Sequence, residues 1–428
     1  MRDQIGKKTF LGFGLGAVQS GLMLYEAFNS GNFDRYVLLE VNEEIVDAVR
    51  KCGNKIVVNT AKMDGIVKST LSGLEIYNPN DPADHEAIAS SIYDADEMAT
   101  AVPSVDFYDI GQSSIARLLA VNVNPDKPQI LYAAENNNYA AEILLDKTHA
   151  YHTGDRLRNF QPVNTVIGKM GGVIVDNETI ENFDLGRMTA CSKPAILVEE
   201  FNKIIISKTN LKNFKRGIEV FQEKDDLLPF EEAKLFGHNA VHSMLGFFAA
   251  LRSYKYMSEI RTDPQLYQYG LRAFQDESGA FLLKKYSRLS DPLFTKEGFD
   301  FYGTDLLERM TNPYLRDEVK RICRDPVRKL GYNDRLFGTI REALSQGVHA
   351  RILAKAVLGG ICYIINNHIE TDFSYPTSIE YLDEGNVRAI IRRIWKTHSA
   401  DVERDEAVDM VCAELDEFLE EFISVKKH

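Results

Sequence analysis

The first half of the chain alternates short apolar runs with amphipathic stretches, and this alternation limits the possible folds more than any other feature. The apolar runs end in small or polar residues; they are KTFLGFG, RYVLLEVN, KIVVNT, EMATAVP and QILYAAEN. Stretches with helical periodicity, such as NEEIVDAVRKCG and SSIARLLAVNV, lie between them. Strands that alternate with helices predict an α/β fold with a parallel sheet joined by right-handed crossovers.

From about residue 199 the pattern changes to long helical periodicities with few strands. Examples are AVHSMLGFFAALRSYKYMSEI, IREALSQGVHARILAKAVLGGICYIINN and NVRAIIRRIWKTHSA. We therefore expect a doubly wound, Rossmann-type domain at residues 1–197 and a mainly α-helical domain at residues 198–428. No apolar run approaches the roughly 20 residues that a membrane-spanning helix needs.

The net charge of −13 argues against a general nucleic-acid binder, which normally carries a basic balance. The five cysteines are scattered without a CxxC pair, a pattern typical of reduced thiols in the cytoplasm. The histidines form no HExxH motif. His149 and His152 could face one metal, but we expect them to lie in a solvated loop, so no metal is predicted. We expect a cytoplasmic monomer or weak homodimer with a small-molecule partner and no nucleic-acid or membrane partner.

The stretch FLGFGLGAVQSG places Gly12, Gly14 and Ala17 in a GxGxxA spacing between an apolar run and a helix-like segment. Gly12 is expected to permit a tight turn, and Gly14 to let the backbone approach a pyrophosphate. Ala17 is expected to let the helix pack closely on the strand. The helix N-terminus then faces the phosphates, so the stretch predicts a dinucleotide site.

The second run, RYVLLEVN, supplies Glu40 where the next strand should end, 28 residues after Gly12. An acidic side chain there accepts hydrogen bonds from ribose hydroxyls and repels a 2′-phosphate, which favours NAD over NADP. Thr100 and Val102, in the run EMATAVP, are further candidates for cofactor contacts. The alternative is that Glu40 only caps a strand end.

The stretch EEAKLFGHNAVH holds a lysine, an asparagine and a histidine among apolar residues. On a continuous α-helix, five residues span about 500°, or about 140° net, so Lys234 is displaced around the helix from Asn239. Lys234 and His242 are about 80° apart and can lean toward a common point. The alternatives are a solvated lysine and a satisfied core histidine.

KLFGHNAVH also resembles the K-x4-N-x2-H motif of the polyol-specific long-chain dehydrogenases, the family that includes the mannitol dehydrogenases. AENNNYAAE, EEFNKIIISKTNLKN, DESGAFLLKKY and NPYLRDEVKRICRDPVRKLGYNDRL resemble segments of its mannitol-1-phosphate 5-dehydrogenase branch. The resemblance covers about residues 8–365. It implies a metal-independent oxidoreductase that uses NAD on an alcohol.

The resemblance implies a role for each polar residue of this motif. Lys234 is expected to be the base, because partial burial beside a positively charged nicotinamide disfavours its ammonium form. Asn239 and Asn136 are expected to donate to the developing oxyanion. His242 is expected to bond a neighbouring substrate hydroxyl and hold Lys234, and Glu231 to pass protons to solvent.

A second cluster bears on the class of substrate. Four cations lie in the segment that resembles the branch's RKL…DRL pattern: Arg324, Arg328, Lys329 and Arg335. A phosphate suits forked arginine donors, so the resemblance implies a substrate-phosphate pocket. The alternative is a solvated helix face with ion pairs.

One departure from the family concerns the substrate. Where the family carries V-D-R-I, this chain has Gly168 in place of the aspartate and Lys169 in place of the arginine. We expect interconversion of a sugar-alcohol phosphate and a ketose phosphate, of the mannitol 1-phosphate and fructose 6-phosphate type. The alternatives are a free-polyol dehydrogenase or hexuronate reductase of the same family, and a non-catalytic NAD-binding sensor, which Gly168 alone favours.

Overall fold

The computed structural model describes residues 8–152 and 154–423. The chain divides into two compact units, residues 1–228 and residues 229–428. This division lies 31 residues after the predicted boundary at residues 197 and 198. The N-terminal unit is longer because two short strands, β11 (Ile205–Ser207) and β12 (Gln222–Lys224), still join its sheet.

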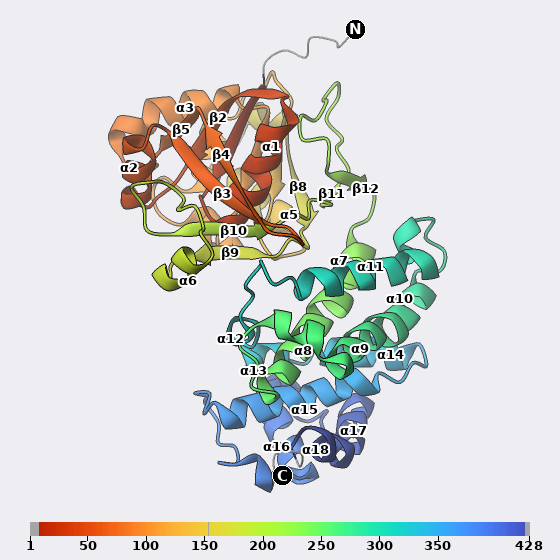
Figure 1. Cartoon of the computed structure of the whole chain (residues 1–428). Helices are drawn as coiled ribbons and strands as arrows, with labels where there is room; N and C mark the ends of the chain where they lie inside the picture. Colours follow the sequence, from red (N-terminus) through yellow and green to blue (C-terminus); the bar gives the residue numbers. More distant parts are fainter. Residues whose placement is uncertain (1–7, 153, 424–428) are drawn as a thin grey trace. The chain divides into compact units, whose positions relative to one another are not determined.

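Within the described residues, the main sheet of the N-terminal unit has the strand order β12-β11-β8-β7-β6-β1-β2-β5 (Figure 1). The parallel part consists of β1 (Lys8–Phe13), β2 (Phe33–Leu39), β5 (Leu74–Tyr77), β6 (Glu97–Thr100), β7 (Gln129–Ala133) and β8 (Phe160–Val166). Only the β8–β11 pair of this sheet is antiparallel. The predicted α/β, Rossmann-type fold is confirmed, and the strand order reverses on either side of β1.

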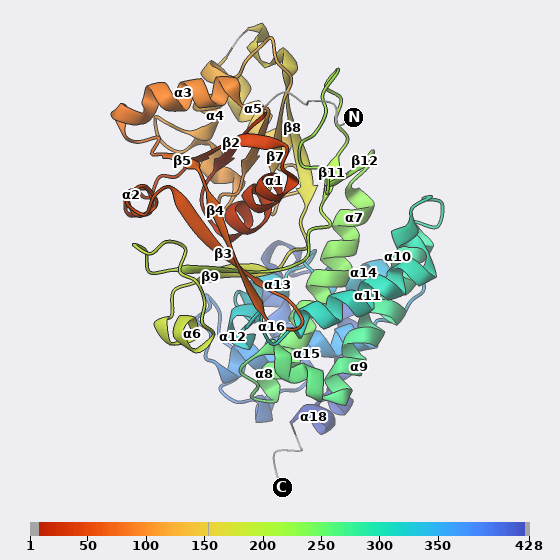
Figure 2. The same ribbon diagram turned by 45° about the horizontal axis from the view of Figure 1, so that its top comes forward.

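Neighbouring residues of β1 contribute to two different cores. Phe10 packs with Leu22 on one face of the sheet, and Leu11 packs with Leu119 on the other. One core receives side chains from η1 (Gln19–Met23), α1 (Leu24–Ser30) and α2 (Glu43–Lys51), and the other receives them from α3 (His85–Asp94), α4 (Ile115–Asn122) and α5 (Ala140–His149). Figure 2 shows helices α1 to α5 around the sheet. A strand covered on both faces is buried along its length, as KTFLGF is, and the residues after Lys8 and Thr9 are apolar or glycine.

The run KIVVNT forms β3 (Lys55–Ala61), but this strand lies outside the parallel sheet that the alternation predicted. β3 makes a hairpin with β4 (Ile66–Ser72) and pairs in parallel with β10 (Ala195–Glu199), whose other neighbour is β9 (Gly171–Ile174). Several side chains of β4 are exposed, as is typical of an antiparallel pair with one solvated face. The apolar pattern predicted the strand but not the sheet that it joins.

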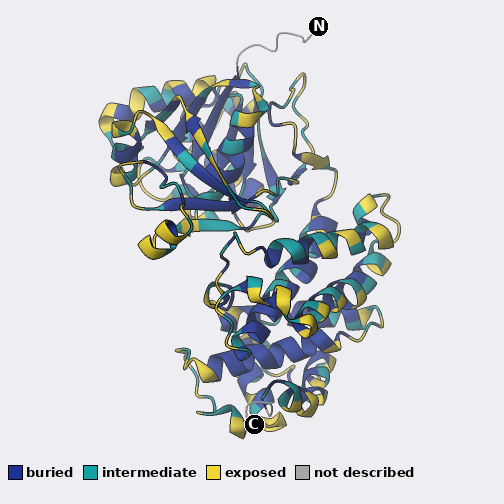
Figure 3. Ribbon diagram, viewed as in Figure 1, coloured by how far each residue is buried: buried dark blue, intermediate teal, exposed yellow. Residues whose placement is uncertain are grey.

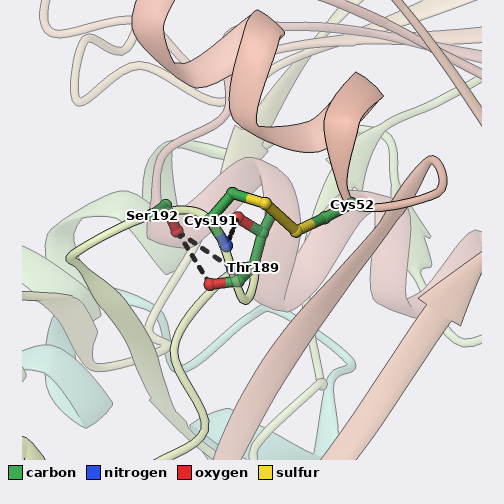
Figure 4. The surroundings of a disulfide bond; sticks show 4 residues. All are labelled: Cys52, Thr189, Cys191 and Ser192. Atoms are coloured by element: carbon green, nitrogen blue, oxygen red, sulfur yellow. Dashed lines mark hydrogen bonds between the residues drawn. A yellow bond between two sulfur atoms is a disulfide. The ribbon is translucent and has the colours of Figure 1, made fainter.

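A disulfide joins Cys52, at the end of α2, to Cys191 in the loop before β10 (Figure 4). The exposed Cys191 donates its backbone N–H to Thr189 Oγ1 at 3.2 Å. The pairing corrects the expectation that all five cysteines are reduced thiols, because cysteines 139 residues apart meet only once β3 and β10 pair. The remaining cysteines, Cys323, Cys362 and Cys412, are free thiols.

The C-terminal unit is built around helix α15 (Arg351–Asn366), in which every residue from 352 to 365 is buried (Figure 3). α15 packs against α8 (Ala240–Leu251), where Gly359 and Gly360 leave room for the rings of Phe248 and Phe247. A helix that is apolar around its whole circumference is typical of a position surrounded by other elements. The other α-helices described in this unit are α9 (Pro264–Arg272), α10 (Gly279–Lys285), α11 (Lys296–Met310), α12 (Val319–Ile322), α13 (Pro326–Lys329), α14 (Phe337–Ser345), α16 (Glu384–Trp395), α17 (Glu406–Ala413) and α18 (Leu415–Phe422).

The periodic run from residue 340 to residue 367 is divided between two helices. α14 ends at Ser345, and Gly347 then adopts φ +73°, a left-handed conformation that a glycine tolerates and that ends a helix. α15 begins four residues later. Across residues 8–152 and 154–423, no helix is long and apolar enough to cross a membrane.

Candidate functional site

The glycine turn has the predicted location, but its glycines have different roles from those predicted. Gly12 lies inside β1, and a side chain there would collide with the amide of Gln19, so Gly12 permits close packing of the following helix. Gly14 makes the turn: its φ is +89°, and its N–H donates to Leu39 O at 2.8 Å. Ala17 already lies in the helical segment.

A pocket of about 800 Å³ lies beside this turn, entirely within the N-terminal unit. Its lining includes Gly14, Gly16, Ala17, Glu40 and Val102, and therefore four of the predicted cofactor residues. The Glu40 carboxylate accepts the backbone N–H of Asn42 at 2.9 Å, which orients it directly after β2. The pocket thus combines a glycine turn, a helix start and an acidic side chain after the second strand.

These features fit a dinucleotide. A Cβ added at Gly16 would meet nothing within 4 Å, so the backbone there is open to a ligand. The volume is in the range of small-molecule sites, and the pocket lies where the sheet order reverses, the usual ligand position in doubly wound folds. Glu40 disfavours a 2′-phosphate, so the residues present fit NAD better than NADP.

Thr100 is not among the residues that line the pocket. It is fully buried at the end of β6 and donates its hydroxyl to Glu135 at 2.8 Å. Glu135 also accepts the backbone N–H of Val102 at 2.9 Å and the hydroxyl of Tyr108. Burial raises the pKa of the Glu135 carboxyl, and these three donors oppose that rise. Glu135 therefore holds the pocket wall at Val102, a role that sequence reasoning missed.

Asn136 follows Glu135 and is exposed, three residues after the end of β7. Lys169, which stands where the family has an arginine, donates to Phe201 O at 2.8 Å. Its charge also acts on the buried Glu26, whose pKa is raised by burial and lowered by Asn202 and Lys169, with a net rise. Gly168 and Lys169 thus lie in the N-terminal unit after β8, outside the lining of the pocket.

In the C-terminal unit, Lys234 and Asn239 lie in one π-helix, η5 (Ala233–Asn239), between α7 (Leu228–Glu232) and α8. Hydrogen bonds of a π-helix join residues five apart, so Lys234 and Asn239 lie about one turn apart on the same side. The predicted 140° displacement, which assumed an α-helix, is therefore wrong. Within η5, the Phe236 carbonyl accepts a hydrogen bond from the Ser278 hydroxyl at 2.7 Å. Short π segments within helices are frequent at functional sites.

Lys234 is partly buried, and burial together with the charge of Arg335 lowers its pKa to about 8. Glu231, one turn earlier, acts in the opposite direction and raises the pKa. A lysine in this state is partly neutral near physiological pH and can accept a proton. Two other predicted site residues, Glu231 and Arg335, therefore act electrostatically on Lys234.

His242, on α8, faces a residue that the sequence did not indicate. Its Nε2 lies 3.2 Å from Oδ2 of Asp317, whose side chain is 1% exposed. Asp317 is also bound by Arg321. The ring of His238 lies 6.0 Å from that of His242, and burial holds the pKa of His238 well below its usual value, so His238 is neutral. Asp317 lies within the quoted NPYLRDEVKRIC segment, but no spacing rule links it to His242.

The four predicted phosphate-binding cations separate into two pairs. Lys329 is buried and Arg335 has 13% of its side chain exposed; burial and Arg335 lower the pKa of Lys329 to about 8. Arg324 and Arg328 lie at the surface. Asp334 accepts from Arg335 Nε at 2.8 Å and from Arg328 at 3.3 Å. Only Arg335 is coupled to Lys234 among these four.

No group of three or more metal-ligating side chains occurs among residues 8–152 and 154–423. Both residues that sequence reasoning missed, Glu135 and Asp317, are buried carboxylates. A carboxylate in an otherwise apolar sequence context, as in YAAEN, is the one signal that could have indicated Glu135.

Comparison with known proteins gives a family match for the C-terminal unit. Residues 226–416 match the family described as the mannitol dehydrogenase C-terminal domain. Among curated proteins, the chain is 28% identical over 359 residues to a mannitol-1-phosphate 5-dehydrogenase of Thermoanaerobacter pseudethanolicus. The alignment covers 82% of this chain and 84% of the relative.

Two solved structures share the overall fold. A substrate-free D-sorbitol dehydrogenase matches with a TM-score of 0.71 at 14% identity, covering 97% of this chain and 93% of the other. The Pseudomonas fluorescens mannitol 2-dehydrogenase ternary complex with NAD and D-mannitol matches with a TM-score of 0.64 at 14% identity, covering 96% and 95%. At this identity the matches establish the fold.

Proposed function

We propose that the chain is an NAD-dependent oxidoreductase of the mannitol dehydrogenase family that interconverts a sugar-alcohol phosphate and a ketose phosphate. The match of residues 226–416 to the C-terminal domain of that family supports this proposal. The relative named mannitol-1-phosphate 5-dehydrogenase supports both the reaction and the substrate class. The observation that carries the proposal is the lowered pKa of Lys234 beside Arg335. Lys234 can accept a proton near neutral pH, and Arg335 attracts an anion.

In the N-terminal unit, the backbone around Gly14, Gly16 and Ala17 would hold the pyrophosphate of the dinucleotide. Glu40 would accept hydrogen bonds from a ribose, and Val102 would form part of the wall. When bound there, NAD would supply the hydride acceptor that oxidation of the alcohol requires. Glu135 keeps Val102 and the end of β6 in position through its three hydrogen bonds.

In the C-terminal unit, neutral Lys234 removes the proton from the substrate hydroxyl. Asn239 lies on the same side of η5 as Lys234 and donates an amide N–H to the oxygen on which negative charge develops. Asn136, which belongs to the N-terminal unit, is proposed as a second donor to this oxygen. Glu231 then receives the proton from Lys234 and releases it to solvent. Arg335 and Lys329 bind the substrate phosphate, with Arg328 and Arg324 at its outer side.

One observation favours a second candidate, oxidation of a free polyol. Asp334 already pairs with Arg335 and with Arg328, and a carboxylate in this position competes with a phosphate for both guanidinium groups. Arg335 would then serve only to lower the pKa of Lys234. Both candidate functions use the same cofactor and the same base. They differ in whether Arg335 and the neighbouring cations bind a substrate phosphate.

The test is a steady-state panel of polyols and their phosphates with NAD and with NADP, followed by the absorbance of the reduced cofactor. We expect phosphorylated substrates with NAD to have a kcat/KM roughly 10–150-fold above that of the free polyols, the value of a charge-assisted contact of about 1.5–3 kcal/mol. Equal kcat/KM for both classes would establish the free-polyol candidate. NAD binding without turnover of any substrate would establish a non-catalytic sensor.

A further inference from the structure

The buried contact between His242 and Asp317 has a consequence for the proton on the histidine ring. Nε2 of His242 lies 3.2 Å from Oδ2 of Asp317, with 14% and 1% of the two side chains exposed. Among the described residues, neither atom makes a hydrogen bond of regular geometry, either with the other or with a third group, so the 3.2 Å approach is a close contact between a ring nitrogen and a carboxylate oxygen. Buried polar atoms are costly unless they are satisfied, so these two atoms must satisfy each other.

The charge of Asp317 is maintained from its other side. Arg321 donates to Oδ1 through Nε at 2.9 Å and through Nη2 at 2.6 Å. Burial by itself raises the pKa of the Asp317 carboxyl, but His242 and Arg321 together hold it below its usual value. Asp317 is therefore a carboxylate that can only accept, and the ring nitrogen that faces it must carry a hydrogen.

We propose that Asp317 is a positioning residue that keeps His242 in the Nε2–H tautomer and leaves Nδ1 as a hydrogen-bond acceptor for a substrate hydroxyl. The inference rests on the proposed function, since it assigns what His242 recognises in the polyol. A neutral imidazole has one donor and one acceptor nitrogen, so the Asp317 contact decides which kind of group the other nitrogen binds. His242 then accepts from a hydroxyl beside the reacting carbon and disfavours a carbonyl there. Neutral His238, 6.0 Å away, adds no competing positive charge.

A double-mutant cycle separates this role from a general contribution to the fold. Asp317→Asn keeps the size of the side chain, and Glu318→Gln, at the exposed neighbouring position, is the matched control. We expect Asp317→Asn to lower kcat/KM about 10–100-fold, as expected when a partner that orients a functional histidine is lost, with NAD affinity unchanged. In a His242→Asn background the same change should cost no more than about two-fold, because its effect passes through the ring. Losses that multiply in the double variant would overturn the proposal.

A second measurement needs no turnover. In protein labelled with ¹⁵N-histidine, long-range ¹H–¹⁵N correlations identify the tautomer of each neutral ring, and His242→Asn assigns the signal. We expect His242 to carry its hydrogen on Nε2; a hydrogen on Nδ1 in the wild-type protein would overturn the inference. An inactive protein with the Nε2–H tautomer would reject the proposed reaction and leave this assignment standing.

Discussion

The guanidinium charge of Arg335 acts on Lys234 within the C-terminal unit. Burial lowers the pKa of Lys234 most, the charge of Arg335 is the second cause, and together they bring it to about 8. If neutral Lys234 is the base, kcat/KM for oxidation should rise with pH up to about 8 and then level off. Arg335→Ala removes a positive charge that opposes the ammonium form, so its inflection should move to higher pH. Lys284→Ala, at the surface, is the control. Identical profiles for all three proteins would show that Arg335 does not act on the group that titrates.

Lys234→Ala should lower kcat about 10²–10⁴-fold, the contribution of a positioned general base. NAD affinity, measured by calorimetry, should be unchanged, because the predicted cofactor pocket lies within the N-terminal unit. Lys284→Ala, an exposed lysine that donates to Gln346 O, is a suitable control. A Lys234→Ala protein with wild-type turnover would return this residue to the solvated-lysine alternative.

Glu40→Ser should weaken the preference for NAD over NADP by about 1–3 kcal/mol, the effect of losing a charged hydrogen-bonding group. Glu40 lines the pocket and accepts from Asn42, whereas the nearby Glu44 is exposed in the first turn of α2 and provides the charge-matched control, Glu44→Ser. The measurement is kcat/KM with each cofactor. Equal use of NAD and NADP by the wild-type protein would disprove the role of Glu40.

Arg335→Ala should raise KM for the phosphorylated substrate roughly 10–150-fold with little change for the free polyol, because one charge-assisted contact is lost. Both substrates should be measured above the pH inflection, so that the effect on Lys234 is removed. Inorganic phosphate should inhibit the wild-type enzyme more strongly than this variant. If KM rises equally for both substrates, Arg335 does not bind phosphate.

Cys191→Ser should lower the free energy of unfolding by about 2–4 kcal/mol under non-reducing conditions, because the disulfide closes a long loop in the unfolded chain. In denaturant titrations, non-reduced Cys191→Ser and the wild-type protein in excess dithiothreitol should then have the same free energy of unfolding. Cys412→Ser removes a free thiol and should leave this difference intact. Thiol labelling of both Cys52 and Cys191 in the purified, non-reduced protein would contradict the pairing.

The sequence by itself determined the parts of this protein that depend on local spacing. The alternation of apolar and amphipathic runs predicted the α/β unit. The spacing between Gly12 and Glu40 predicted a glycine turn after the first strand and an acidic residue at the end of the second strand. Both patterns extend over few residues, and backbone geometry converts such spacing directly into position. Local spacing also predicted that Lys234 and His242 lean toward a common point, whereas Asn239 was grouped with them only through the resemblance to the K-x4-N-x2-H motif.

The tertiary structure decided what depends on packing between distant segments. β3 pairs with β10 and not with the main sheet, and this pairing brings Cys52 to Cys191. Lys234 and Asn239 share a side because η5 is a π-helix, in which the Phe236 carbonyl bonds the distant Ser278. Asp317 reaches His242 from 75 positions further along the chain. None of these contacts has a period or a spacing in the sequence, because each depends on which buried surfaces and polar groups meet once the whole chain has folded.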